Sequence, residues 1–429
     1  MKSSISLFMA LFFIISVSTL SFASGQKEGA EKSMAAEPVE LEFPSWQATE
    51  PGTSDFWKAL NAAFQTQHPE VSITFTHLPY PDYVKTMITR FAAADTPDIF
   101  HLPAANLYAF AQEGWLEPLD PYLAGTDILK SWIPLQESWN RYKGDTLALM
   151  VLGYGWVLGY NQRMLDNEGL KVPTKGDEMT EAAAKMTKDT NGDGVTDQFG
   201  WAVATATHPD VVSIFFQQCI GRTGKNVLGA DGSFNEDVVR IGLTSFKKLV
   251  NNKSTPMGLN SNGRRSAYSE GRAAMMLEGP WIEGFIDSAP ADVRPHLKVG
   301  NFPFTYTAGG PSNVLAIPSN LDKKTKNLVA EFIKLFATTE FQQKYAEIAG
   351  QPPSRKGVIT PEILKKRPNM GIYSDEASKA IRYAPPGLEL NYTEWQKTMI
   401  DLILEHILHD RPIDQVIGDI KDLSLKLKK

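Results

Sequence analysis

Cysteine is almost absent from this chain of 429 residues, since Cys219 is the only one. A single thiol cannot close a disulfide within the chain, and no cysteine near the N-terminus is placed to receive a lipid. No basic residue lies beside Cys219 to activate it, so we expect a small buried apolar side chain there.

An excess of positive charge is also missing. Lys and Arg number 43 against 49 for Asp and Glu, which gives a formal net charge of -6. Nucleic-acid binding needs a concentrated basic face, and the sequence shows none. We therefore do not expect nucleic acid as a partner.

Long apolar runs are confined to the start of the chain. Lys2 precedes an apolar run at 7–17, and Ser21-Phe22-Ala23 follows it with small residues at the two positions that a signal peptidase reads. The run is shorter than the roughly 20 residues that span a bilayer, which disfavours the alternative of a membrane anchor. The pattern predicts a signal peptide at 1–23, a flexible polar linker at 24–38, and a soluble protein in the periplasm or another extracytoplasmic space.

Signatures of catalysis are lacking as well. The sequence contains no Gly-x-Ser-x-Gly elbow, no His-Glu-x-x-His helix and no Gly-x-x-x-x-Gly-Lys phosphate loop. We therefore do not expect an enzyme. An exported glycoside hydrolase stays open as an alternative, because its two carboxylates leave no motif in a sequence.

What the mature sequence does contain is an alternation of strand and helix patterns. Apolar residues alternate with polar ones at 39–43 and 71–75, helical spacing follows each of these segments, and a short apolar strand is predicted at 98–102. This order predicts an α/β fold with a parallel sheet covered on both faces. The length is about twice that of a typical domain, which favours two domains.

Ligands of such sheets bind beyond the carboxyl ends of the strands. Aromatic and polar residues that follow the predicted strands are therefore candidate ligand contacts, and we select Trp46, Glu50, Tyr83, His101 and Asn106. Two alternatives stay open: the Trp46 ring could fold into the local core, and the position of Tyr83 within a helix favours a core role.

Several segments resemble one known family. They are FAAADTPDIFHL at 91–102, LGYNQ at 158–162, GLKVP at 169–173, MMLEGPW at 275–281 and GGPSNVLAI at 309–317. In order and spacing they are similar to segments of extracellular solute-binding proteins of the maltose-binding type, which are the substrate-binding subunits of bacterial sugar ABC transporters. The resemblance covers most of the mature chain.

The resemblance implies an α/β, two-lobe periplasmic-binding-protein fold. Each lobe would be a mixed, mostly parallel sheet flanked by helices, and strands that cross between the lobes would form a hinge. We expect an N-terminal lobe from 39–150 with 304–340, and a C-terminal lobe from 151–303 with 341–429. The apolar run at 147–152, followed by glycines, is typical of a buried strand that leaves the first lobe.

Aromatic residues near glycines indicate the kind of ligand. An indole or phenol ring packs on the C–H face of a sugar, and amide or charged side chains bind its hydroxyl groups. The candidates of this kind are Tyr154, Trp156, Trp201 and Trp281, together with Gly310 in the paired-glycine strand and Arg355 as a planar donor. Trp281 is the strongest, because the resemblance and the Gly279-Pro280 turn agree. Tyr154 and Trp156 could alternatively fill the seam between the lobes.

A possible calcium loop lies at 189–197. Oxygen ligands occupy its positions one, three, five and nine, which are Asp189, Asn191, Asp193 and Asp197. Position twelve is Gly200, where the motif needs a glutamate, and the alternative is a simple tight turn. No other cofactor is expected.

The sequence therefore predicts an exported, monomeric solute-binding protein that captures a carbohydrate, with an oligosaccharide favoured, and delivers it to the permease subunits of an ABC importer. Within the same family a polyol phosphate is an alternative ligand, for which Arg264-Arg265 or Arg355 would supply the positive charge.

Overall fold

A parallel pair of strands begins the described part of the chain. The computed structural model describes residues 38–133, 136, 139–251 and 253–428, so the predicted signal peptide and almost all of the linker lie outside it. β1 (Val39–Ser45) and β2 (Val71–His77) pair in parallel, with α1 (Thr53–Gln67) as the connection between them. The buried apolar side chains of α1 recur at helical spacing, which confirms the predicted helix.

The third strand has an antiparallel neighbour that the sequence did not predict. β3 (Phe100–Pro103), which follows α2 (Tyr80–Ala92), pairs antiparallel with β10 (Ala308–Ala316). The backbone N–H of Ile99 still donates to the Glu42 carbonyl of β1 at 3.0 Å. The antiparallel partner of β3 was not predicted, because it comes from a segment about two hundred residues later, which local periodicity cannot reveal.

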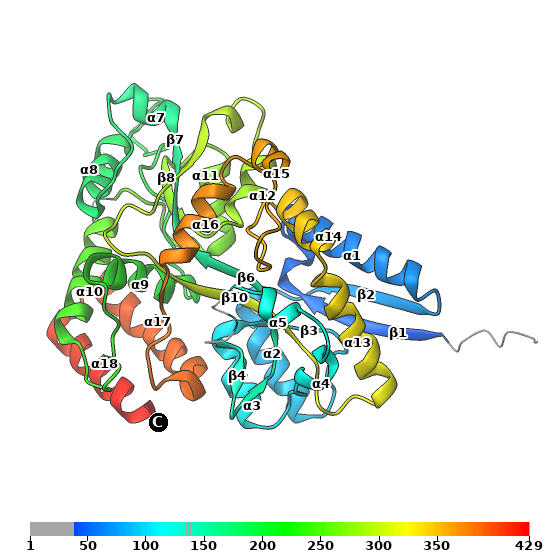
Figure 1. The fold of residues 1–429 in the computed structure, drawn as a ribbon. Helices are drawn as coiled ribbons and strands as arrows, with labels where there is room; N and C mark the ends of the chain where they lie inside the picture. The colour runs from blue at the N-terminus through cyan, green and yellow to red at the C-terminus, as the bar shows by residue number, and fades with distance from the viewer. Residues whose placement is uncertain (1–37, 134–135, 137–138, 252, 429) are drawn as a thin grey trace, which may run out of the picture. The chain divides into compact units, whose positions relative to one another are not determined.

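β6 (Leu149–Gly155) and β10 cross the centre of the described chain (Figure 1). The two strands pair antiparallel, with a register shift near Asn313, and every residue of β6 is buried. β10 also pairs in parallel with β11 (Ile381–Arg382). After Trp156 the chain continues into β7 (Val157–Asn161), the middle strand of a second sheet, so β6 and β7 lead from one sheet to the other.

The second sheet is antiparallel. β7 pairs on one side with β8 (Met275–Glu278) and on the other with β9 (Leu297–Gly300). The mixed α/β class is therefore confirmed, although this sheet contains fewer parallel pairs than predicted.

Separate groups of helices build the apolar cores. Near β1 and β6, α1 packs with α13 (Lys323–Phe336) and α14 (Thr339–Lys344). The largest core contains α9 (Asp210–Thr223), α10 (Glu236–Asn251), α17 (Tyr392–His409) and α18 (Ile413–Leu427), which pack on one another. Cys219 is fully buried in this core, as expected. The lobe boundaries stay a prediction, and residues as late as Ala349 pack in the core of α1.

Shorter elements complete the described chain. They are η1 (Trp46–Thr49), η2 (Ala104–Asn106), α3 (Leu107–Gln112), α4 (Asp120–Leu123), α5 (Ile128–Ser131), β4 (Arg141–Tyr142), β5 (Asp145–Thr146), α7 (Gln162–Asn167), α8 (Gly176–Met186), α11 (Ser261–Ser269), α12 (Ile282–Asp287), η3 (Arg294–His296), η4 (Tyr345–Ala349), α15 (Pro361–Lys366), α16 (Met370–Lys379) and η5 (Glu389–Asn391). Among the residues that the structure describes, no helix combines the length and apolar character needed to cross a bilayer.

Candidate ligand-binding site

A cavity of about 490 Å³ has walls from η1, α2, β6, α9, α11 and α17. Its volume is within the usual range for small-molecule sites. The lining residues are Trp46, Gln47, Thr49, Glu50, Pro51, His77, Pro79, Tyr80, Pro81, Pro103, Ala105, Asn106, Tyr154, Trp156, His208, Asp210, Ser213, Asn260, Ser261, Asn262, Arg265, Ser266, Trp281, Phe285, Ser312, Tyr383, Tyr392 and Gln396. Six predicted contacts are among them: Trp46, Glu50, Asn106, Tyr154, Trp156 and Trp281.

Trp46 lies on the cavity wall directly after β1. The chain turns into η1 there because the Ser45 hydroxyl accepts a hydrogen bond from the backbone N–H of Gln47 at 3.0 Å. The Trp46 indole stacks on the His101 ring, with centroids 4.3 Å apart and planes at 10°, and meets the edge of Tyr83 at 4.9 Å. These contacts fix the orientation of the indole.

His101 and Tyr83 were predicted as ligand contacts, but the structure places both behind Trp46 rather than on the cavity wall. The two ring nitrogens of His101 lie 2.8 Å from Ser45 Oγ and 2.7 Å from Asn313 Nδ2. Burial lowers the pKa of His101 to about 3, so the ring is neutral. The Tyr83 hydroxyl donates to the carbonyl of Pro44 at 3.2 Å. In this structure both residues support Trp46.

A second group of aromatic rings surrounds Trp281. Tyr154 meets Trp281 at 4.9 Å and Trp156 at 5.3 Å, and the two indoles lie 5.9 Å apart, all at steep interplanar angles. Tyr154 belongs to β6 and Trp156 to the link into β7, whereas Trp281 follows β8. We call Trp46, Tyr154, Trp156 and Trp281 the aromatic wall.

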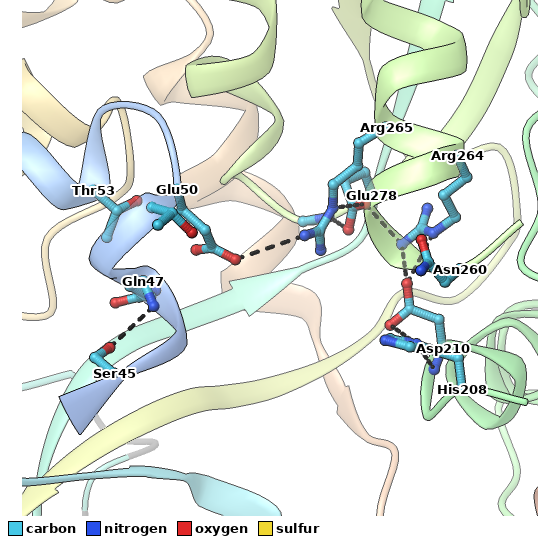
Figure 2. Close-up of polar contacts among 12 residues, drawn as sticks. Ser45, Gln47, Glu50, Thr53, His208, Asp210, Asn260, Arg264, Arg265 and Glu278 are labelled. Atoms are coloured by element: carbon cyan, nitrogen blue, oxygen red, sulfur yellow. Dashed lines mark hydrogen bonds and ion pairs between the residues drawn. The ribbon is translucent and has the colours of Figure 1, made fainter. Parts of the chain in front are cut away.

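Charged side chains form the other notable part of the site (Figure 2). Oε1 of Glu50, at the end of η1, lies 3.7 Å from Nη1 of Arg265, whose Nε donates to Glu278 Oε2 at 2.9 Å. Glu278 also binds Nη2 of Arg264 at 2.7 Å, and Nε of Arg264 donates to Asp210 at 2.8 Å. We call these five residues the charge chain.

The local fold explains why the charge chain forms. The Asn260 side chain caps α11 by accepting from the backbone N–H of Gly263. Arg264 and Arg265 are neighbours on this helix, so their side chains leave it in different directions. Glu278, the last residue of β8, is fully buried and lies where both guanidinium groups can reach it.

The environment shifts the pKa values within the charge chain in different directions. Burial raises the pKa of Glu50 to about 7, although the positive charge of Arg265 opposes the shift. For Asp210, burial is outweighed by the charges of Arg264 and His208, which hold its pKa well below the usual value. Burial disfavours the charged form of Arg265, yet its acidic neighbours keep its pKa above the ordinary value. Glu50 is therefore the cavity carboxyl that titrates near neutral pH.

A close backbone contact brings the turn after Glu50 against α12. A Cβ atom added to Gly284 would lie 2.2 Å from the carbonyl oxygen of Pro51, closer than any real Cβ contact. Glycine is therefore required for α12 to approach the turn as closely as it does.

Three further predicted contacts do not line the cavity. Gly310 lies on β10 opposite Tyr154. Trp201 is buried in the largest core. Arg355 forms an ion pair with Asp127 and donates to the Ala337 carbonyl at 3.2 Å.

Several cavity residues were not selected from the sequence. They are mainly in the segments 208–213, 260–266 and 383–396, and they include Asp210, Asn260, Asn262, Ser266, Tyr383, Tyr392 and Gln396. No strand end or family motif marks these segments. The Arg264-Arg265 pair was the one available signal, and it was interpreted only as a possible phosphate site.

The predicted calcium loop is a hydrogen-bonded turn. The Asp189 carboxylate accepts from the backbone N–H groups of Gly192 and Gly194, both at 2.7 Å, and Asp197 accepts from Thr190. Asn191 and Asp193 accept from backbone groups two residues on. Within the described ranges, no group of three or more His, Cys, Asp or Glu residues is arranged to hold a metal ion. Calcium binding stays a prediction.

Comparison with known sequences identifies the class of protein. The profile of the family "Bacterial extracellular solute-binding protein" matches residues 59–372, which is most of the chain. The chain therefore belongs to this family of extracellular binding proteins, which are not enzymes. Membership of this extracellular family confirms the predicted location outside the cytoplasm.

Two individual relatives match this chain at low sequence identity. The chain is 24% identical to the maltotriose-binding protein of Pyrococcus abyssi over 331 residues, covering 75% of this chain and 68% of that protein. It is 22% identical to the multiple sugar-binding protein of Streptococcus mutans over 320 residues, covering 69% and 71%.

Solved structures confirm the two-lobe fold. Maltose-bound MalE3 of T. maritima matches with a TM-score of 0.79 at 21% identity, covering 90% of this chain and 99% of that one. A chitin oligosaccharide binding protein matches with a TM-score of 0.77 at 19% identity, covering 91% and 99%.

Proposed function

We propose that this chain captures a carbohydrate in the described cavity and delivers it to the permease subunits of an ABC importer. The observation that carries the proposal is the composition of the cavity wall, which combines aromatic rings with amide, hydroxyl and carboxylate groups. A sugar needs both, because its C–H faces pack on rings and its hydroxyl groups need donors and acceptors.

Separate residues of the cavity wall provide the rings and the hydrogen-bonding groups. The aromatic wall supplies four of the aromatic side chains that line the cavity. Polar groups that can bind hydroxyls lie beside it, including Gln47, Asn106, Asn260 and Ser312. The names of the relatives support the proposal, since proteins with the same family fold are described as binding maltotriose, several sugars or chitin oligosaccharides.

Binding and delivery would be linked thermodynamically. The cavity is lined by residues that follow strands of different sheets, with Trp46 after β1 and Trp281 after β8. A ligand that contacts both therefore favours the closed arrangement. A permease that recognises this arrangement then binds the loaded protein more tightly, and by reciprocity it favours ligand retention until transport begins. Export by a cleaved signal peptide, without a lipid anchor, and action as a monomer belong to the same proposal.

The test is a binding screen by calorimetry and intrinsic tryptophan fluorescence against maltotriose, xylotriose, chitotriose, ribitol and amino acids. We expect saturable binding of at least one carbohydrate with a fluorescence change, because several wall residues are tryptophans. The bound sugar should be recovered intact by chromatography. Binding of amino acids alone, or release of cleaved sugar, would contradict the proposal.

A further inference from the structure

The cavity wall contains more carboxylate groups than guanidinium groups. Of the lining residues, Glu50 and Asp210 carry carboxylates, Arg265 carries the guanidinium, and none is a lysine. Arg265 is already bound to Glu278 at 2.9 Å and lies 3.7 Å from Glu50. The cation that faces the cavity is therefore committed to protein partners (Figure 2).

Releasing Arg265 to an anionic ligand would leave a buried charge without compensation. Glu278 is fully buried, so it needs both guanidinium groups, and Arg264 is shared between Glu278 and Asp210. A phosphate or carboxylate in the cavity would compete with Glu278 for Arg265 while lying close to Glu50.

The histidines of the wall do not supply the missing charge. His208 Nδ1 accepts the backbone N–H of Asp210 at 3.1 Å and lies 3.5 Å from the Asp210 carboxylate, so this ring is already paired with Asp210. His77 is exposed at the edge of the cavity, where its ring lies 3.2 Å from the Thr49 hydroxyl.

A neutral hydroxylated ligand meets none of these obstacles. One hydroxyl can donate to Glu50 while another accepts from Arg265, and no ion pair has to break. Arg265 is held for this role by Trp281 and Phe285, whose ring centroids lie 5.8 and 5.5 Å from the guanidinium carbon.

We propose that Glu50 and Asp210 restrict this cavity to uncharged polyhydroxylated ligands and exclude carboxylated or phosphorylated ones. Glu50 is the main specificity-determining residue, because it is the lining carboxylate that lies beside Arg265, 3.7 Å from its guanidinium group. The proposal rests on the proposed function and decides between its neutral and phosphorylated ligand classes.

The test measures dissociation constants at pH 8, where Glu50 is ionised, for neutral and anionic probes. The neutral probes are maltotriose, xylotriose, chitotriose and ribitol, and the anionic probes are trigalacturonate and glycerol 3-phosphate. The proteins are the wild type, Glu50→Gln, and Glu113→Gln, which makes the same charge change at an exposed residue outside the cavity. Circular dichroism and thermal unfolding establish that each variant folds.

We expect the wild type and Glu113→Gln to bind a neutral probe and to discriminate against both anions. In Glu50→Gln the ratio of neutral to anionic affinity should fall by at least about tenfold. Tighter binding of an anion than of every neutral probe by the wild type, or an unchanged ratio in Glu50→Gln, would overturn the proposal while leaving solute capture intact. Binding of no sugar or polyol, charged or neutral, would overturn the proposed function and this inference together.

Discussion

The aromatic wall and the charge chain lie side by side in one site, yet they differ in how they are held. Each ring of the wall packs against neighbouring rings. A different apolar side chain of similar size keeps part of such packing. The charge chain is a series of ion pairs around the fully buried Glu278, in which removal of one member leaves another uncompensated. The wall should therefore tolerate substitution with a graded loss of affinity, whereas the charge chain should not tolerate the loss of its shared partner Glu278.

The largest effect is expected at Glu278. Its replacement by alanine leaves two buried guanidinium groups without their shared partner, and should lower the free energy of unfolding by about 3 to 5 kcal/mol in urea titrations. Glu270→Ala, which removes an exposed pair with Arg272, is the control and should cost at most about 1 kcal/mol. Equal losses of unfolding free energy in both variants would show that the charge chain contributes no more to stability than an exposed ion pair does.

The next effect is a pH dependence caused by Glu50. Burial raises the pKa of this carboxyl from the usual 4.5 to about 7 in the folded protein. Arg265 and Gln47 oppose the shift, whereas Glu278 and Asp210 add to it. Because the folded pKa is the higher one, its stabilising contribution is complete below pH 4.5 and is lost as the pH rises through 7.

Between these limits the unfolding free energy of the wild type should fall relative to that of Glu50→Gln, by an amount on the order of 3 kcal/mol. Urea titrations of both proteins at several pH values measure this difference. A constant difference from pH 4.5 to 8 would show that the carboxyl does not titrate in this range.

Trp281 tests the aromatic wall. Trp281→Ala should weaken binding of the cognate sugar by about 2 kcal/mol, or roughly thirtyfold in Kd, measured by calorimetry. Trp281→Phe keeps a ring and should lose less. An affinity within twofold of the wild type for the alanine variant would place the sugar elsewhere.

The smallest effect is expected in the loop at 189–197. Asp193→Ala removes one exposed hydrogen bond to the backbone N–H of Val195, and in the presence of a chelator it should cost about 1 kcal/mol or less. The same variant measured with calcium added is informative: a much larger loss there would support the predicted calcium ion.

The sequence predicted the parts of the site that depend on local patterns. Trp46 follows a strand of clear period two and Trp281 follows a Gly-Pro turn, so both could be found without knowing the fold. His101 also follows a predicted strand, but whether its ring faces the cavity or supports Trp46 depends on Ser45 and Asn313, which come from two other strands.

The charge chain could not be predicted in this way. Its members come from residues 50, 210, 264, 265 and 278, and they meet because η1, α9, α11 and β8 converge in space. The antiparallel pairing of β3 with β10 was missed for the same reason. Local periodicity gives the elements, whereas the contacts between distant segments decide which charged groups become partners.

The contact between Gly284 and Pro51 has a mechanical consequence. A methyl group at position 284 has no room, so an alanine side chain there would push α12 away from the turn that follows Glu50. One added carbon beside the lining residues Pro51 and Phe285 would thereby hold α12 and this turn further apart, and should shorten the time that a captured molecule stays bound.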